Sequence, residues 1–352
     1  MTNPFRRAAL FAIAALGLLA PLSEVAALEG KWTPQQVLDL DAQELRAQGL
    51  EIPPSELWGP DGAGLLDAAV SIDGCSAGFV SPDGLLATNH HCVFSILQVH
   101  STPERDLIEL GFVAKTRTEE LSGGTVRAQI PHRSTDVTAE VEAAAAAAGS
   151  DDFARFRAIE RKGKELVAAC EKTPSRRCQL ATFDGGVRYL LLEAIEYPDV
   201  RLAWAPPLAI GNFGGEVDNW SWPRHTGDFG LLRVWANADG SPAPKGQGTV
   251  PFRPRHFFPV SAEGVSAGSF VMIAGYPGTT FRSLVAQEMR EKAERLYPDR
   301  VALFRRWIDL MESSSKTSDA ARIALADRVK NLANREKNSR GQIAGFERGQ
   351  LI

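Results

Sequence analysis

Between Gly74 and Thr88, hydrophobic and polar positions follow a pattern typical of two short paired strands. Two apolar runs flank Pro82-Asp83-Gly84, a combination that favours a tight turn. Thr88 leads directly into Asn89-His90-His91-Cys92. We therefore predict a hairpin that carries a histidine and a cysteine at the end of its second strand, and a further strand over residues 65–72 that enters it.

The rest of the chain divides into strand-like and helix-like stretches. A helix is expected to start at Trp32-Thr33-Pro34, since proline suits the first turn. Residues 136–171 predict two helices separated by Gly149-Ser150-Asp151-Asp152, which can cap the second. After about residue 282, Leu325, Val329 and Leu332 follow the i, i+4, i+7 spacing of a helix. Strands are expected at 125–130, 178–183, 187–195, 200–204, 228–235 and 270–275.

Residues 1–27 have the character of a secretory signal peptide. Arg6-Arg7 gives a basic start, Ala8 to Ala20 forms an apolar core, and Val25-Ala26-Ala27 resembles a cleavage site. We therefore expect a periplasmic or secreted protein, with an uncleaved membrane anchor as the alternative. No other stretch approaches the ~20 apolar residues that span a bilayer, so no membrane contact is expected after cleavage.

Composition narrows the class of protein further. Hydrophobic residues make up 44% and charged residues 23% of the chain, as in globular proteins. The net charge is −4 and no basic block occurs, which argues against nucleic acid as a partner. Four cysteines in an exported chain suggest two disulfides, with three possible pairings. Closeness in sequence favours Cys75–Cys92 and Cys170–Cys178, and free buried thiols are the alternative.

His91 is the candidate general base of a serine peptidase, because such an enzyme needs a histidine held in one tautomer by a carboxylate. Asp228, which heads an apolar strand, is the favoured carboxylate, and Asp218 is its rival. On an extended chain His90 would point to the face opposite His91, and the neighbouring Cys92 favours His91.

A metal site is the competing interpretation of the same region. His90, His91, Cys92 and His100 offer ligand atoms, but adjacent side chains point in opposite directions and a cysteine is better placed in a disulfide. We therefore expect neither a metal ion nor another cofactor.

The serine nucleophile is not found in this sequence. Gly74-Cys75-Ser76-Ala77-Gly78 and Gly264-Val265-Ser266-Ala267-Gly268 match the nucleophile-elbow pattern. That elbow needs a helix after the serine and a histidine later in the chain. Strands are expected after both serines, and no histidine lies beyond His256. No Gly-x-Ser-Gly occurs after Asp228, so we expect the nucleophile to lie outside this chain.

A second cluster with possible function lies between Asp218 and His225. Asn219 stands beside Trp220 in a Gly-rich region, with Trp222 close behind. The amide oxygen could accept a hydrogen bond from a substrate ammonium. Packing of an aromatic loop onto the body of the protein explains the same residues, and His225 is expected to stabilise the loop.

These motifs together closely resemble the bacterial dipeptidyl-peptidase 7 and 11 family. The resemblance starts at Gly30-Lys31-Trp32-Thr33-Pro34 and continues to the end of the chain. It is carried by Gly74-Cys75 through His91-Cys92, Asp199-Val200-Arg201-Leu202, Ala205-Pro206-Pro207, Ile210-Gly211-Asn212-Phe213-Gly214-Gly215, Asp218-Asn219-Trp220, Trp222-Pro223-Arg224-His225-Thr226-Gly227-Asp228-Phe229 and Gly275-Tyr276-Pro277-Gly278.

The resemblance implies a periplasmic serine exopeptidase that releases dipeptides from free peptide N-termini. It implies a mainly β fold, a chymotrypsin-like double β-barrel with an inserted α-helical domain. This chain would hold the first barrel, the start of the second and the beginning of the helical domain. By position, His91 and Asp228 match the catalytic histidine and aspartate. Asn219, Trp220 and Asn334 match the residues that bind the substrate's α-amino group. The N-terminal part of the peptidase domain would then occupy residues 28–281, with a helical insertion at about 136–172. Residues 282–352 would form the first part of the helical domain.

The family's chains are about twice this length, and their serine lies in the C-terminal half. We therefore expect a fragment that is inactive alone. The resemblance also suggests that the full-length enzyme is a homodimer. One alternative is a non-catalytic secreted protein that binds peptide N-termini. A weaker one is a trypsin-like endopeptidase, which would also accept a blocked N-terminus.

Overall fold

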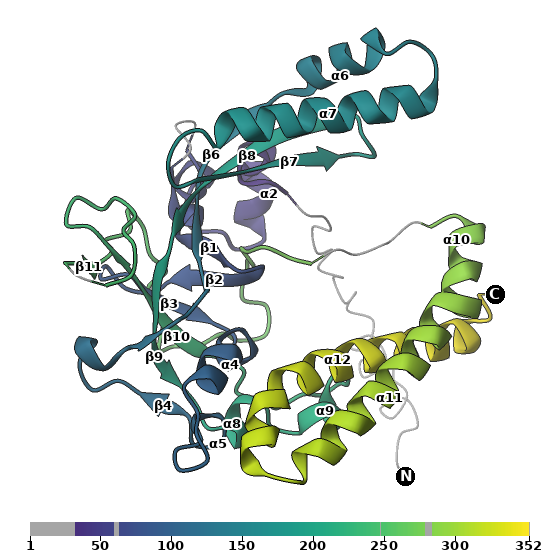
Figure 1. Ribbon diagram of the computed structural model, residues 1–352. Helices are drawn as coiled ribbons and strands as arrows, with labels where there is room; N and C mark the ends of the chain where they lie inside the picture. The colour runs from purple at the N-terminus through teal and green to yellow at the C-terminus, as the bar shows by residue number, and fades with distance from the viewer. Residues whose placement is uncertain (1–31, 60–62, 247, 279–283, 352) are drawn as a thin grey trace, which may run out of the picture.

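The computed structural model describes residues 32–59, 63–246, 248–278 and 284–351, so the expected signal peptide lies outside the described residues (Figure 1). Within these ranges the strands form one antiparallel sheet in the order β4-β9-β10-β3-β2-β1-β6-β8-β7, with β11 beside β10 and β5 beside β9. The strands are β1 Ala69–Ile72, β2 Cys75–Phe79, β3 Leu85–Thr88, β4 Phe112–Val113, β5 Leu121–Ser122, β6 Ala128–Asp136, β7 Arg176–Phe183, β8 Arg188–Tyr197, β9 Asp199–Ala205, β10 Gly230–Ala236 and β11 Val250–Pro251.

Two long helical hairpins flank this sheet in Figure 1, α6 and α7 at one end and α11 and α12 near α4, α8 and α9. None of the described helices is both long enough and apolar enough to cross a membrane. The helical elements are η1 Pro34–Asp39, α2 Ala42–Ala47, α3 Pro54–Leu57, η2 Leu65–Ala68, α4 His90–Val99, α5 Leu107–Leu110, η3 Arg117–Glu119, α6 Thr138–Ala147, α7 Asp152–Cys170, α8 Leu208–Gly211, α9 Gly215–Asp218, α10 Ala286–Glu291, the π-helical turn η4 Lys292–Leu296, α11 Tyr297–Ser315 and α12 Asp319–Gly349.

The predicted hairpin is present as β2 and β3. The Ser81 hydroxyl accepts hydrogen bonds from the backbone N–H groups of Asp83 and Leu85 and so closes the turn. Gly84 has φ +71°, and a Cβ there would lie 2.7 Å from the Phe252 carbonyl oxygen, so the turn requires glycine. The hairpin is therefore fixed by its turn as well as by the apolar faces of its strands.

The main core lies between the sheet and α4. Alternate positions on β10, Leu232 and Val234, are fully buried, as strand periodicity requires. On α4, Val93 and Leu97 are one helical turn apart and both buried in the same cluster. Packing of α4 onto the sheet therefore determines where the first turn of this helix, with its two histidines, lies.

Helices α6 and α7 pack over β7 and β8 around a smaller cluster that includes Val141 and Tyr189. The Asp151 carboxylate accepts a hydrogen bond from the backbone N–H of Ala154 and caps α7, as its position in the sequence suggested. The Cys170–Cys178 disulfide joins the end of α7 to β7. Both favoured cysteine pairings are thus present, since Cys75 and Cys92 are also joined.

Helix α12 is attached to the sheet side of the molecule through α4. The Gln98 side-chain amide donates to the carbonyl oxygens of Ile323 (2.7 Å) and Ala324 (2.8 Å). Arg322 pairs with Asp106, and Ile323 is buried in the main core. These contacts place one face of α12 against the part of the chain that carries the candidate site.

Three sequence predictions were wrong. Residues 65–68 form the helical turn η2, and only 69–72 is a strand. His90 and His91 begin a helix instead of ending a strand. Residues 270–275 form no strand: Ile273 is 95% exposed, and no strand among the described residues pairs with it. An apolar run alone does not make a strand, because a strand also needs a neighbour for its backbone hydrogen bonds.

Candidate active site

Strand register brings His91 and Asp228 together. Strands β3 and β10 pair so that Thr88 lies opposite Gly230. His91 follows Thr88 by three residues and Asp228 precedes Gly230 by two, so both lie just beyond the same end of this strand pair. The Asn89 amide, at the N-cap of α4, donates to the carbonyl oxygen (3.1 Å) and to carboxylate Oδ2 (3.3 Å) of Asp228. The two chain segments are thus tied to each other directly.

Both oxygens of the Asp228 carboxylate contact His91. Oδ2 lies 2.8 Å from the ring nitrogen Nδ1, and Oδ1 accepts the backbone N–H of His91 at 3.0 Å. A carboxylate only accepts hydrogen bonds, so Nδ1 carries the proton and Nε2 is left as the basic nitrogen of the neutral ring. Side-chain exposure is 52% for His91 and 23% for Asp228. The pair therefore has the geometry of a general base with its orienting acid.

The electrostatics keep Asp228 ionised. Burial acts to raise the pKa of this carboxyl, but the hydrogen bonds and charge of His91, with a smaller contribution from Lys330, outweigh it and lower the pKa to about 2. Asp228 can therefore stabilise a positive charge on the His91 ring at any ordinary pH. The rival carboxylate, Asp218, lies on α9, and it is Asp228 that meets His91.

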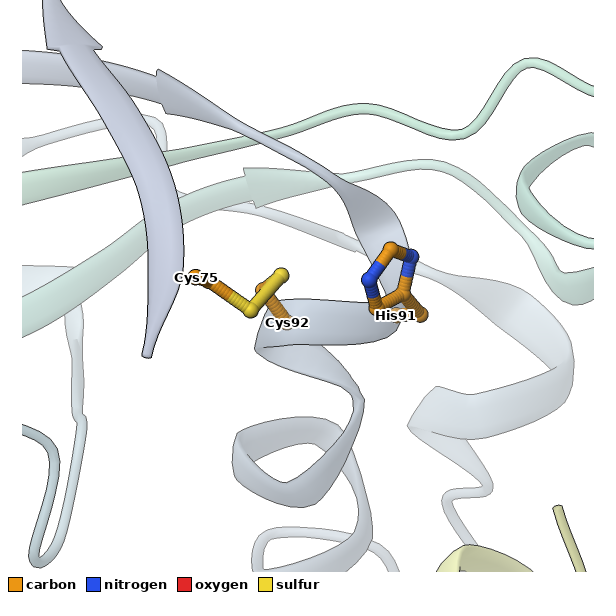
Figure 2. Close-up of side chains that lie close together, drawn as sticks. All are labelled: Cys75, His91 and Cys92. Carbon is orange, nitrogen blue, oxygen red and sulfur yellow. A yellow bond between two sulfur atoms is a disulfide. The ribbon is translucent and has the colours of Figure 1, made fainter. Parts of the chain in front are cut away.

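The Cys75–Cys92 disulfide lies beside His91 and links β2 to the first turn of α4 (Figure 2). A ring nitrogen of His91 lies within 4.8 Å of both sulfur atoms. The sulfur atoms are bonded to each other, so Cys92 has no thiolate to offer the metal site considered above. The disulfide instead holds the backbone next to His91 in place.

His90 is completely buried. Its ring packs edge-on against Phe94 and lies so close to Gly211 that a Cβ on that glycine would come within 2.5 Å of it. Neither ring nitrogen has a hydrogen-bond partner among the described residues. Burial, and then the charge of Lys330, lower the pKa of His90 to about 4, so the ring is neutral. His100 is also held locally, with Nε2 2.9 Å from the Ser122 carbonyl oxygen.

Asn219, Trp220 and Asn334 lie in one cluster although about 115 residues separate the loop from the helix. Asn334 Oδ1 accepts a hydrogen bond from the Asn219 amide and another from the Trp220 indole, both at 3.0 Å. Trp220 has φ +58°, a conformation that is uncommon outside glycine. We call these three residues the amide cluster.

Three charged residues support the amide cluster, and sequence reasoning missed all of them as functional residues. Glu216 Oε2 accepts from the Asn219 amide at 3.0 Å, and Arg224 Nη1 donates to Asn219 Oδ1 at 2.8 Å. The Lys337 ammonium donates to the carbonyl oxygens of Glu216 and Val217. Lys337 lies one turn beyond Asn334 on α12, and this i, i+3 spacing was the available signal.

Two cavities in the described part of the chain lie away from these residues. One, of about 490 Å³, is apolar and lies between the N-terminal helices and residues 258–274. The other, of about 440 Å³, follows charged side chains along α7. Neither is lined by His91, Asp228 or the amide cluster, so the candidate site rests on side-chain geometry.

Comparisons with known proteins agree on one family. The Peptidase S46 family model matches residues 27–352. The Asp/Glu-specific dipeptidyl-peptidase of Shewanella putrefaciens is 35% identical over 329 residues, which cover 92% of this chain and 44% of that protein. Dipeptidyl-peptidase 7 of Phocaeicola vulgatus is 33% identical, with 89% and 44% covered. The chain thus spans less than half the length of these relatives.

Solved structures give the same result at the level of the fold. The crystal structure of Porphyromonas endodontalis DPP11 in complex with the dipeptide Arg-Glu matches with a TM-score of 0.80 at 33% identity, over 92% of this chain and 47% of that one. The sheet and helices described above are therefore those of a DPP11-like fold. With a family model that matches nearly the whole sequence, this chain belongs to the Peptidase S46 family.

Proposed function

We propose that this chain is part of a serine-type dipeptidyl aminopeptidase and carries its general base and orienting acid. The observation that carries the proposal is that a His–Asp pair and a cluster of amide groups lie on connected elements: α4 bears His91, and α12, which is anchored to α4, bears Asn334. The relatives' names as dipeptidyl-peptidases support the same reaction class.

In the proposed mechanism, His91 Nε2 removes the proton from a serine hydroxyl, and Asp228 stabilises the positive ring that results. We place that serine outside residues 1–352, because the two matches to the nucleophile elbow do not fit. Ser76 lies within β2, where its hydroxyl accepts the backbone N–H of Tyr276, and Ser266 lies in a loop with its hydroxyl against Ser269. The chain alone would then be inactive, since the acyl-enzyme cannot form.

The amide cluster would bind the free α-amino group of a peptide and so set the distance to the cleaved bond. An exopeptidase must measure from a charged terminus, and hydrogen-bonding groups held on an element that is anchored to α4, the helix of the base, provide such a reference point. We further propose a double β-barrel in the complete enzyme, export to the periplasm, and a homodimer. These follow from the resemblance and from the signal-like residues 1–27.

A peptide-binding protein without catalysis is the second candidate, because the amide cluster is assembled in this chain independently of any serine. The mass of the protein purified from its native host with an antibody to residues 28–280 separates the two. A species near twice the mass of this chain supports the enzyme, whereas one that matches residues 28–352 supports the binding protein.

Cleavage assays on the purified native protein test the reaction class. We expect it to release dipeptides from a peptide with a free N-terminus and to leave the N-acetylated peptide intact. Equal cleavage of both peptides would instead identify an endopeptidase and would remove the role proposed for the amide cluster.

A further inference from the structure

Glu216 determines how the amide of Asn219 is oriented. The carboxylate can only accept hydrogen bonds, and it meets the Asn219 amide nitrogen at 3.0 Å. The Arg224 guanidinium can only donate, and it meets Asn219 Oδ1 at 2.8 Å. Reversing the Asn219 amide would place oxygen against carboxylate and nitrogen against guanidinium. Glu216 and Arg224 together therefore fix the orientation.

The fixed orientation leaves few acceptor positions within the amide cluster. Asn334 Oδ1 already accepts from the Asn219 amide and the Trp220 indole, which uses both of its lone pairs. Asn219 Oδ1 accepts from Arg224 and keeps one lone pair. A substrate ammonium brings three donors and a full positive charge. The neutral groups of the cluster therefore satisfy one another and offer little to a cation.

Glu216 supplies what the amides lack. Its carboxylate and Asn334 Oδ1 lie on the same Asn219 amide nitrogen, each at 3.0 Å from it. The carboxylate accepts from Asn219 and keeps further lone pairs, so a small three-donor group beside the cluster could bind to it. Charge-assisted hydrogen bonds are roughly twice as strong as neutral ones, so a carboxylate is the better partner for an ammonium.

The Glu216 carboxylate is also free to take a cation. Among the described residues, no Lys, Arg or His forms an ion pair with it within 4.0 Å. The nearby Lys337 ammonium donates to main-chain oxygens of residues 216 and 217, and Lys330 acts on Glu216 only through space. Lys337 thus holds α12 against residues 216 and 217 without pairing with the Glu216 carboxylate.

We propose that Glu216 is the anionic partner of the substrate's α-ammonium group, a specificity-determining residue for peptides with a free N-terminus. This inference rests on the proposed function, in which the amide cluster receives that terminus. Asn219 and Asn334 then define the direction of approach, and Glu216 provides the charge that distinguishes an ammonium from a blocked, neutral N-terminus.

Calorimetric titration of the native full-length protein with the dipeptide Arg-Glu and with N-acetyl-Arg-Glu tests this inference. Glu216→Gln keeps the side-chain shape and an oxygen acceptor for Asn219 while removing the charge. We expect it to weaken binding of the free dipeptide at least tenfold and to leave binding of the acetylated one unchanged within twofold. Asp218→Asn, which removes a carboxylate two residues away, should alter neither.

The outcomes separate this inference from the proposed function. If the unaltered chain shows no preference for the free dipeptide, the amide cluster does not receive the N-terminus and both ideas fail. If the preference is present and Glu216→Gln retains it, only the role of Glu216 is overturned. Circular dichroism of each variant verifies the fold, and Glu216→Asp, which restores the charge on a shorter side chain, should recover part of the preference.

Discussion

The two parts of the candidate site are built in different ways. His91 and Asp228 are placed by the register of β3 and β10, by the Asn89 contact and by a disulfide beside the base. The amide cluster instead joins the loop after α9 to helix α12 through hydrogen bonds of the exposed Trp220 and Asn334 and the half-buried Asn219. Backbone pairing within a sheet fixes positions more firmly than the docking of a helix. The chemical pair should therefore tolerate changes that disrupt the amide cluster.

The largest effect is expected from the pair itself. Asp228→Asn leaves the side-chain shape but removes the charge and allows the wrong His91 tautomer, so kcat should fall by roughly 10³- to 10⁴-fold. The measurement is the rate of dipeptide release by the native full-length protein and by its Asp228→Asn variant. Asp218→Asn is the matched control and should stay within twofold. Loss of activity in the control alone would reassign the orienting acid to Asp218.

Gly211 provides the second test, because it packs against the buried His90 ring on α4, whereas the control position lies on α12. A Cβ at this position would lie 2.5–2.6 Å from the buried His90 ring, so Gly211→Ala should destabilise the fold by about 2–3 kcal/mol in urea unfolding. Gly345→Ala is the control: on α12 an added Cβ meets nothing within 4 Å, and stability should rise by about 0.5–1 kcal/mol. Equal effects would show that His90 does not pack as described.

The sequence predicts some parts of the fold and of the candidate site better than others. The hairpin, its Pro82-Asp83-Gly84 turn and both cysteine pairings follow from local patterns, and they place His91. The position of Asp228 follows from strand pairing, which the sequence suggests only through an apolar run. Asn334 could be placed beside Asn219 only through the family resemblance, because no local pattern relates residues so far apart.

The failures have physical causes as well. Residues 270–275 are as apolar as a buried strand, but pattern alone does not supply a pairing partner. The hairpin pattern predicts an extended chain at His90 and His91, although Asn89 is an N-cap residue type and α4 begins immediately after it. Glu216 and Lys337 were overlooked because charged residues on helices are normally solvated, and their role appears only when α9 and α12 meet.

The dependence of stability on pH between 6.5 and 4 tests whether His90 is buried as a neutral ring. Unfolded His90 binds a proton near pH 6.5, whereas in the fold it does so only near pH 4, because burial lowers its pKa. The unfolded state therefore binds more protons between these values, and stability should fall as pH drops from 6.5 to 4, by about 3 kcal/mol. This loss should be absent in His90→Leu. Replacement of the exposed His225 by leucine should retain it, and an unchanged slope in His90→Leu would contradict the burial of a neutral ring.

The smallest effect is expected from Lys337, and it should separate the His91–Asp228 pair from the amide cluster. Lys337→Met removes the donor that joins α12 to the main-chain oxygens of Glu216 and Val217, at 2.5 and 2.6 Å. Free-amine dipeptides should then bind about tenfold more weakly, which corresponds to about 1.4 kcal/mol. The kcat of the native protein should stay unchanged, because the sheet holds the His91–Asp228 pair in place. Lys316→Met, at the exposed C-cap of α11, is the matched control. A fall in kcat without a change in binding would mean that α12 supports the base instead of the amide cluster, and the two parts of the site would have to be treated as one.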